Sequence, residues 1–288
     1  MIDSSSSTGT TARVRPAIWI GLVALAFYIF LAAVVGNLLG GLAPEGDDTA
    51  EFVYSHYIPL VIGIGAGLFF IRWAGWQGIW TEQPTPTMRP RRYWLIAIPV
   101  LAAILPLSGF SNVAWADVAI TTVLIIGVGT LLVGLGEELY VRGILLVGVR
   151  ERHGELATLL ITSISFGLAH IVGDLFTGAP LAFILFQVSA IIMAGIAYYW
   201  IRRVTGRLWV AILVHALTDG VLYLAAGAPS GGHSLHSEAL TTNESVSATA
   251  QILLLVFSAV SVISVILEDR RNRQNRQNVP APTEAQTP

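Results

Sequence analysis

The chain of 288 residues is apolar and poor in charge, which excludes most classes of soluble protein. Hydrophobic residues make up 54% of it and charged residues 12%, whereas a soluble domain carries about 25% charged residues. There is no cysteine, so disulfides and thiolate chemistry are excluded. Every basic residue is arginine, which excludes lysine-based Schiff-base catalysis and a phosphate-binding Walker lysine.

Long apolar runs recur along the chain, and each is a candidate membrane span. A span needs about 20 apolar residues to cross roughly 30 Å of hydrocarbon. The fourth run is too long for one upright crossing, so we expect it to tilt or to extend past the bilayer. The first run exceeds the roughly 7–15 apolar residues of a signal peptide, so we interpret it as a retained span. In chain order the eight candidates are Ala17–Leu42, His56–Trp73, Tyr93–Phe110, Val118–Val149, Leu156–Val172, Leu181–Ile201, Leu208–Ala226 and Thr249–Leu267.

The placement of arginine gives the direction in which the chain crosses the membrane. Cytoplasmic connections carry an excess of basic residues, and arginines here precede the first span, follow the last and occupy every second connection. The opposite connections hold acidic residues such as Glu45, Asp174 and Glu238. The sequence therefore predicts an all-α, polytopic integral membrane protein with about eight transmembrane helices and both termini in the cytoplasm.

We expect five regions along this chain, with no soluble domain and no internal repeat. The two ends are polar, and such segments bury too little apolar surface to fold. The regions are a disordered arm (1–16), N-terminal transmembrane helices (17–115), a helical core with polar intramembrane residues (116–227), an outer loop with the last span (228–267), and a basic then disordered tail (268–288).

Three ionisable residues lie together in the fourth run: Glu137, Glu138 and Arg142. Each costs roughly 2.5–3.5 kcal/mol at the centre of a membrane helix, so such groups are candidates for a functional site. Glu138 and Arg142 are i,i+4 neighbours and can pair on one helix face, which by itself would only orient helices. Glu137 lies about 100° further round the helix, so one carboxylate is left for another role.

Two later spans carry histidines at i,i+4 spacing from a side chain on the same face. Phe166 and His170 share a face in span five, although a lone intramembrane histidine is often only a packing residue. His215 and Asp219 share a face in span seven, where a carboxylate can fix the tautomer of the imidazole. The other four histidines lie at span ends or in loops: His56, His153, His233 and His236.

These side chains together suit hydrolysis of an amide. A carboxylate or a histidine–carboxylate pair can activate water, and a second histidine can polarise the carbonyl group or hold the oxyanion. Two histidines with one carboxylate are also a catalytic zinc set, although there is no HExxH motif. If a divalent metal such as zinc is bound, we expect Glu137, His170 and His215 to hold it.

In this order on three membrane helices, the motifs resemble those of the CPBP superfamily. That superfamily contains CAAX-processing endopeptidases and bacteriocin-processing or Abi proteins. The match runs from about Gly134 to Gly220 and leaves spans one to three and eight outside it. It implies a fold of about eight helices, with 116–227 as the catalytic core and endopeptidase chemistry near the cytoplasmic side of the bilayer. The motifs are E-E-x-x-x-R (Glu137, Glu138, Arg142), F-x-x-x-H (Phe166, His170) and H-x-x-x-D (His215, Asp219).

The resemblance also implies a role for each motif residue. Glu137 would activate water and His170 would share or orient it, while His215 and Asp219 would face the substrate carbonyl. The first-motif residues Glu138 and Arg142 would form a structural pair. The superfamily leaves open whether the chemistry is that of a metalloprotease or of a metal-independent glutamate enzyme.

Asp219 departs from the prenyl-processing members, which have asparagine at this position. Asparagine can donate a hydrogen bond to an oxyanion, whereas an ionised aspartate only accepts. Asp219 is therefore protonated, or it orients His215, or it ligates a metal.

The sequence thus predicts an intramembrane endopeptidase in a bacterial plasma membrane. Its partners would be the lipid bilayer and a peptide or membrane-tethered protein substrate, with no nucleic acid; the sequence does not indicate an oligomeric state. One alternative is a non-proteolytic scaffold or immunity protein that keeps the motifs for folding. The other is a proton-coupled transporter, in which buried carboxylates and histidines relay protons.

Overall fold

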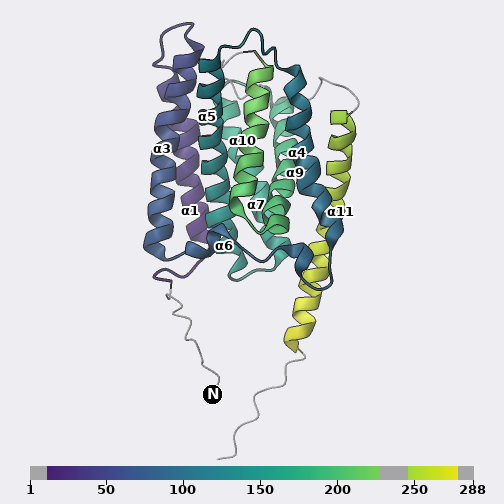
Figure 1. Ribbon diagram of the computed structural model, residues 1–288. Coiled ribbons are helices and arrows are strands. Elements are labelled where there is room, and N and C mark those ends of the chain that lie inside the picture. The colour runs from purple at the N-terminus through teal and green to yellow at the C-terminus, as the bar shows by residue number, and fades with distance from the viewer. Residues whose placement is uncertain (1–11, 228–245, 278–288) are drawn as a thin grey trace, which may run out of the picture.

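The computed structural model describes residues 12–227 and 246–277, and their regular elements are all helical (Figure 1). Eight stretches in this part of the chain are long and apolar enough to cross a membrane, which confirms the predicted all-α polytopic fold. The stretches are Ile18–Gly40, Asp48–Ala74, Tyr93–Asn112, Ile120–Arg150, Glu155–Phe176, Leu181–Thr205, Leu208–Ala225 and Val246–Asn275.

Some spans are unbroken helices and others are chains of shorter helical elements. The unbroken ones are α3 (Asp48–Ala74), α9 (Leu181–Thr205), α10 (Leu208–Ala225) and α11 (Val246–Gln277). The composite ones are α1–η1–α2 (Ile18–Ile29, Phe30–Val35, Gly36–Gly40), η4–α4–η5 (Tyr93–Ile96, Ala97–Gly109, Phe110–Asn112), α5–η6–α6 (Ile120–Glu138, Leu139–Leu145, Leu146–Arg150) and α7–α8 (Glu155–Ala169, Ile171–Phe176).

The long fourth run is one continuous helical stretch of 31 residues. At 1.5 Å per residue it is roughly 46 Å long, so it exceeds the roughly 30 Å of hydrocarbon. Its middle section, η6, is π-helical, begins directly after Glu138 and contains Arg142. Short π-helical stretches are rare in proteins, but those that occur are often found at functional sites.

Two predicted boundaries differ from the structure. α3 begins at Asp48, because the Asp47 carboxylate accepts a hydrogen bond from the Ala50 N–H at 2.9 Å and caps the helix. His56 therefore lies two turns inside a span, which corrects its predicted place at a span end. Within the predicted N-terminal arm, the Val14 carbonyl accepts from the indole of Trp76 at 2.8 Å. The predicted loop histidines His233 and His236, the arm before residue 12 and the tail after residue 277 lie outside the described residues.

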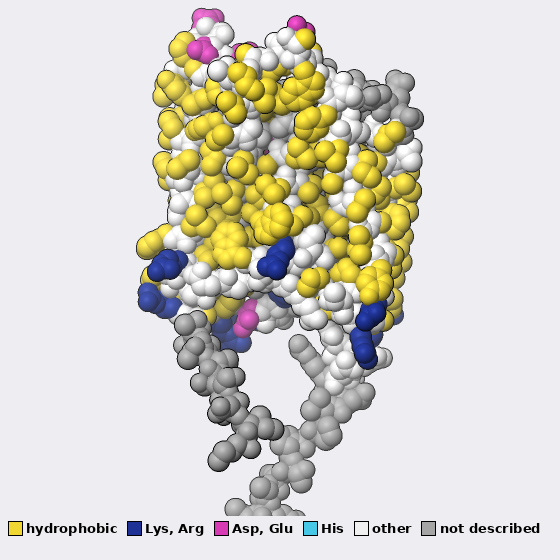
Figure 2. All heavy atoms as spheres, in the orientation of Figure 1, with side chains coloured by type: hydrophobic (Ala, Val, Ile, Leu, Met, Phe, Trp, Pro, Cys, Tyr) yellow, Lys and Arg dark blue, Asp and Glu magenta, His cyan; other side chains and the backbone are white. Residues whose placement is uncertain are grey.

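The two ends of the bundle carry opposite charge (Figure 2). Apart from Arg142, the described arginines lie at one end, where α1 begins and α11 ends (Figure 1); we call it the arginine end. The other end, which we call the acidic end, has no arginine among the described residues and carries Glu45, Asp47, Asp48, Glu51 and Asp117.

Ion pairs tie the helices together at the arginine end. Glu82, in the connection between α3 and η4, pairs with Arg150 at 2.8 Å and with Arg202 at 3.1 Å. Burial alone would raise the pKa of the Glu82 carboxyl, but these two guanidinium groups outweigh it and lower the pKa below its usual value. Arg203 and Glu268 join α9 to α11 at 3.0 Å.

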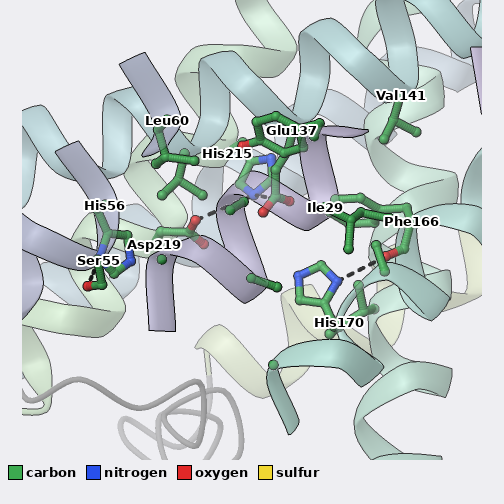
Figure 3. A pocket seen from close by; sticks show the side chains of 18 of the residues that line it. Ile29, Ser55, His56, Leu60, Glu137, Val141, Phe166, His170, His215 and Asp219 are labelled. Carbon is green, nitrogen blue, oxygen red and sulfur yellow. Dashed lines mark hydrogen bonds and ion pairs between the residues drawn. The ribbon is translucent and has the colours of Figure 1, made fainter. Parts of the chain in front are cut away.

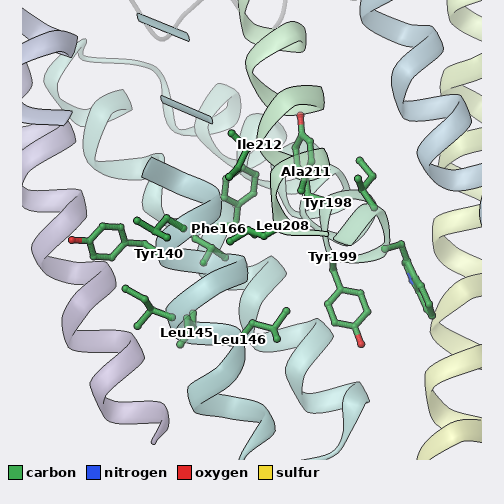
Figure 4. Packing of buried hydrophobic residues seen from close by; sticks show 14 of the residues in the cluster. Tyr140, Leu145, Leu146, Phe166, Tyr198, Tyr199, Leu208, Ala211 and Ile212 are labelled. Carbon is green, nitrogen blue, oxygen red and sulfur yellow. The ribbon is translucent and has the colours of Figure 1, made fainter. Parts of the chain in front are cut away.

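A layer of buried hydrophobic residues packs between the helices (Figure 4). Leu145, Leu146, Tyr199, Trp200 and Leu208 are all 0% exposed. They come from η6, α6, α9 and the first turn of α10, so the layer separates the middle of the bundle from the arginine end.

Glycines allow the central helices to approach closely. A Cβ on Gly134 of α5 would lie 2.8 Å from the Ile212 carbonyl oxygen of α10. A Cβ on Gly195 of α9 would lie 3.0 Å from the Ser163 Cα of α7. The helices that carry the motifs therefore pack backbone against backbone, as small residues permit in membranes.

Candidate active site

A cavity of about 210 Å³ occupies the centre of the bundle (Figure 3). Glu137 of α5, His170 at the end of α7, and His215 and Asp219 of α10 all line it. The structure therefore brings together four predicted site residues from three spans. Of the three remaining motif residues, Phe166 also lines the cavity, whereas Glu138 and Arg142 lie behind its wall and are 0% exposed.

Glu138 and Arg142 form the ion pair expected from their spacing. The Arg142 guanidinium donates to Glu138 Oε1 at 3.1 Å and to the Gly195 carbonyl of α9 at 3.0 Å. It also lies 4.1 Å from the centre of the Phe166 ring, within range of a cation–π contact. One arginine thus links α5, α7 and α9 around the cavity.

His215 is surrounded by carboxylates. Its Nδ1 lies 3.0 Å from Glu138 Oε1, and its Nε2 lies 3.4 Å from Asp219 Oδ2 and 3.7 Å from Glu137 Oε2. The ring is 4% exposed, so few other partners are available to it. Among the three possible roles of Asp219, this contact supports the orientation of His215.

The carboxylates around His215 limit where its ring can carry hydrogens. Glu138 is paired with Arg142, so it accepts the Nδ1–H of His215. A hydrogen bond between Nε2 and Asp219 Oδ2, which lie 3.4 Å apart, needs one further proton, carried either by Nε2 or by the Asp219 carboxyl group. Both residues line the cavity, so this proton would lie at its wall.

Glu137 is the motif carboxylate that faces the cavity. Its side chain is 21% exposed, and Oε2 has no hydrogen-bond partner among the described residues. A buried acceptor without a partner costs free energy, so this oxygen is suited to accept from a ligand or a water molecule.

His170 lies across the cavity from the carboxylates. Its Nδ1 is 2.9 Å from the Phe166 carbonyl oxygen, and a carbonyl only accepts, so Nδ1 carries the hydrogen. In the neutral form of the ring, Nε2 is then an acceptor. His170 and His215 both contact the Phe166 ring edge-on, at centroid distances of 5.2 and 5.7 Å.

The family comparison agrees with this site. Residues 117–221 match the model of a family described as type II CAAX prenyl endopeptidase Rce1-like. This match is consistent with the CPBP superfamily. The resemblance inferred from three motifs is thereby confirmed, and the match contains all six motif residues assigned a role. No curated protein matches the chain.

Two tyrosines of the site were not predicted. Tyr198 of α9, within the matched segment, stacks on His215 with ring centroids 4.7 Å apart at 17°. Tyr28 of α1 lies outside the matched segment, is 3% exposed, lines the cavity and has no hydrogen-bond partner for its hydroxyl among the described residues. Both act across helices, so spacing within one helix gave no signal for either.

The side chains around the cavity can be compared with the donors that a metal ion needs. Among the residues that the structure describes, no group of three histidine, aspartate or glutamate side chains is arranged to hold an ion. Both nitrogens of His215 are directed at carboxylates, and Nδ1 of His170 is used by a carbonyl. In this arrangement the residues do not fit a metal.

Proposed function

We propose that this protein is an intramembrane endopeptidase that hydrolyses a peptide bond of a membrane-associated or peptide substrate. The observation that carries the proposal is the single cavity in which Glu137, His170, His215 and Asp219 meet. The family match supports a CAAX-type protease only at the level of the family, because it assigns no roles to individual residues.

In the proposed reaction, Glu137 is the general base. Its Oε2 takes a proton from a water molecule, and His170 Nε2 accepts the second hydrogen bond of that water. The water oxygen attacks the substrate carbonyl carbon while His215 Nε2 donates to the carbonyl oxygen. The proton that Glu137 has taken passes to the leaving nitrogen as the C–N bond breaks, which yields one carboxylic acid and one amine and returns Glu137 to its ionised form.

Glu138, Arg142 and Tyr198 position these groups. Glu138 Oε1 holds Nδ1 of His215, and the stacked ring of Tyr198 fixes the plane of the imidazole. Asp219 orients the other nitrogen. This role uses the acceptor capacity of an aspartate and needs no donor at that position, where the prenyl-processing members have asparagine.

The substrate we propose is a peptide or membrane-tethered protein, and the setting a bacterial plasma membrane. The cavity lies within the membrane-spanning part of the bundle, so a substrate must enter the bilayer or already be anchored in it. A prenylated CAAX protein is one candidate, suggested by the description of the matching family.

Comparative membrane proteomics of cells with wild-type or Glu137→Gln protein tests this function. Loss of a general base lowers the rate by about 10²–10⁴-fold, so fragments found with the wild type should be absent with the variant. Glu45→Gln makes the same chemical change on an exposed residue at the acidic end and should cleave normally. Purified proteins in proteoliposomes, given the substrates so identified, provide the direct assay.

Wild-type cleavage by Glu137→Gln would refute the mechanism. If an alanine variant at Glu137, His170 and His215 still supported the biological role without cleavage, the scaffold alternative would hold. Proton-coupled uptake in proteoliposomes would support a transporter. The family match favours neither alternative.

A further inference from the structure

The cavity is longer than the catalytic cluster, and its extension runs toward one end of the bundle. Lining residues include Gly40, the last residue of α2, Glu51 and Ser55 in the first turns of α3, and Thr177 directly after α8. Tyr223 lies two residues before the end of α10. All of these positions belong to the acidic end.

The opposite direction is closed. Val141, four residues after Glu137, is the last lining residue of its span toward the arginine end. Beyond it, Leu145, Leu146 and Leu208 are 0% exposed, and the Glu82 ion pairs follow. At 1.5 Å per residue, Glu137 lies roughly 20 Å from the end of its span at Arg150. Among the described residues of this span, none beyond Val141 lines the cavity, so the cavity does not extend through this layer.

Small side chains make the wall of the extension. Ala32, Ala33 and Gly36 come from η1 and α2, and Ala169 and Gly173 face them from α7 and α8. A Cβ on Gly36 would lie 2.7 Å from the Ser55 carbonyl oxygen, so α2 and α3 are already in close contact behind this wall. The wall is apolar and narrow, which suits an extended peptide with modest side chains.

Polar groups gather where the extension reaches the acidic end. We call Asn37, Glu51, Ser55, His56 and Thr177 the outer vestibule; all five line the cavity. His56 Nδ1 lies 2.8 Å from Ser55 Oγ, and Figure 3 shows both side chains beside Asp219, away from His170. The His56 ring stacks on Phe52 at 4.3 Å, which holds it in place.

The charge of the cavity defines the chemistry of its occupant. The acidic side chains that line it are those of Glu51, Glu137 and Asp219, and none of the described arginines lines it. The surrounding acidic end adds further carboxylates and no arginine among the described residues. Such a funnel attracts cations and repels anions.

We infer that the substrate reaches the catalytic groups from the acidic end, and that the outer vestibule binds a cationic nitrogen of a largely apolar peptide against Glu51. The nitrogen is that of a lysine or arginine side chain or of a free amino terminus. This inference rests on the proposed function for the fate of the peptide. It places entry opposite to the cytoplasmic side implied by the resemblance.

Cysteine labelling tests the direction of entry without requiring activity. The chain has no cysteine, so Ser55→Cys and Thr177→Cys each give one thiol in the vestibule, and Gln83→Cys gives one at the arginine end. A membrane-impermeant maleimide is added to sealed vesicles of each orientation. Both vestibule thiols should react from the side opposite to that of Gln83→Cys. Reaction from the same side as Gln83→Cys, or no reaction at either vestibule thiol, would overturn the inference.

Protection from labelling tests the charge of the occupant. The probes are four versions of one short apolar peptide: acetylated with one lysine, acetylated with glutamine in its place, acetylated with glutamate, and unacetylated with glutamine. We expect the first or the last to slow labelling of Thr177→Cys about tenfold, which also identifies the source of the cationic nitrogen. The neutral and acidic acetylated versions should give little protection.

Glu51→Gln in the Thr177→Cys background should remove that protection, and Glu45→Gln should keep it. Equal protection by the neutral peptide, or unchanged protection in Glu51→Gln, would refute the role of Glu51. Neither readout needs cleavage. A failure of the proposed function, seen as normal proteolysis by Glu137→Gln, is therefore distinct from a failure of this inference.

Discussion

Replacing Arg142 by methionine should destabilise the folded protein strongly. Removal of one partner from a buried ion pair costs about 3–5 kcal/mol, and here both side chains are 0% exposed. Arg142→Met also loses the hydrogen bond to the Gly195 carbonyl at 3.0 Å and the contact with the Phe166 ring at 4.1 Å. These losses place the expected value at the upper end of that range, because methionine supplies no donor for the groups left behind.

A second substitution separates charge from packing. Most of the cost of Arg142→Met is the buried charge left on Glu138, which keeps only His215 as a partner. Adding Glu138→Gln removes that charge while retaining an acceptor for Nδ1 of His215. We therefore expect the double variant to be at least about 1 kcal/mol more stable than Arg142→Met alone, a coupling typical of residues in direct contact.

Steric trapping in a bilayer-like detergent measures the free energy of unfolding. This measurement checks the values expected for Arg142→Met and for the double variant. Arg152→Met is the matched control, because Arg152 is exposed after α6 and such substitutions change stability by about 0.5 kcal/mol or less. The reasoning fails if Arg142→Met is as stable as this control. It also fails if Glu138→Gln makes the Arg142→Met protein less stable still.

Four further outcomes are expected. Tyr198→Leu should lower kcat about tenfold and Tyr198→Phe should not, because a stacked aromatic pair is worth about 0.5–1.5 kcal/mol; steady-state kinetics in proteoliposomes would show this split. Tyr28→Phe should keep or raise the thermal midpoint, because it removes a buried hydroxyl without a partner among the described residues; a lower midpoint would show that the hydroxyl has one. The lowered pKa of Glu82 contributes stability that is fully present above about pH 4.5, its ordinary value, and is lost as the pH falls through the folded-state pKa. Glu82→Gln should therefore flatten the dependence of the thermal midpoint on acid pH, and an unchanged slope would contradict the role of its arginines. Dialysis against a chelator should leave cleavage intact, because both ring nitrogens of His215 are directed at carboxylates; loss of activity that zinc restores would contradict this.

Periodicity and charge placement predicted the spans well because both are local properties of the chain. Twenty apolar residues form a helix in hydrocarbon whatever their neighbours are, and the ion pair of Glu138 with Arg142 follows from one turn of a helix. Small errors arose at helix ends. α3 begins at Asp48 because the Asp47 side chain caps it, and a hydropathy pattern does not detect a polar cap.

Contacts between side chains of different helices could not be predicted from the sequence. Tyr198 stacks on His215 only because α9 packs beside α10. His56 lines the cavity only because α3 packs against α2. The same holds for Glu82, whose pairing with Arg150 and Arg202 depends on a connection folding back under the bundle. None of these partners stands at a helical spacing from the others, so no periodic pattern marks them.

The two adjacent glutamates, Glu137 and Glu138, both lie close to the imidazole ring of His215. Consecutive residues on a helix point about 100° apart, so Glu137 and Glu138 approach the His215 ring from different directions. Glu138 Oε1 meets Nδ1 at 3.0 Å, and Glu137 Oε2 lies 3.7 Å from Nε2. Glu138 Oε1 accepts a hydrogen bond from the Arg142 guanidinium, and the same oxygen is hydrogen-bonded to Nδ1 of His215. The structural pair and the catalytic group are therefore joined at one atom, and a change at Glu138 should alter both stability and the tautomer of the histidine.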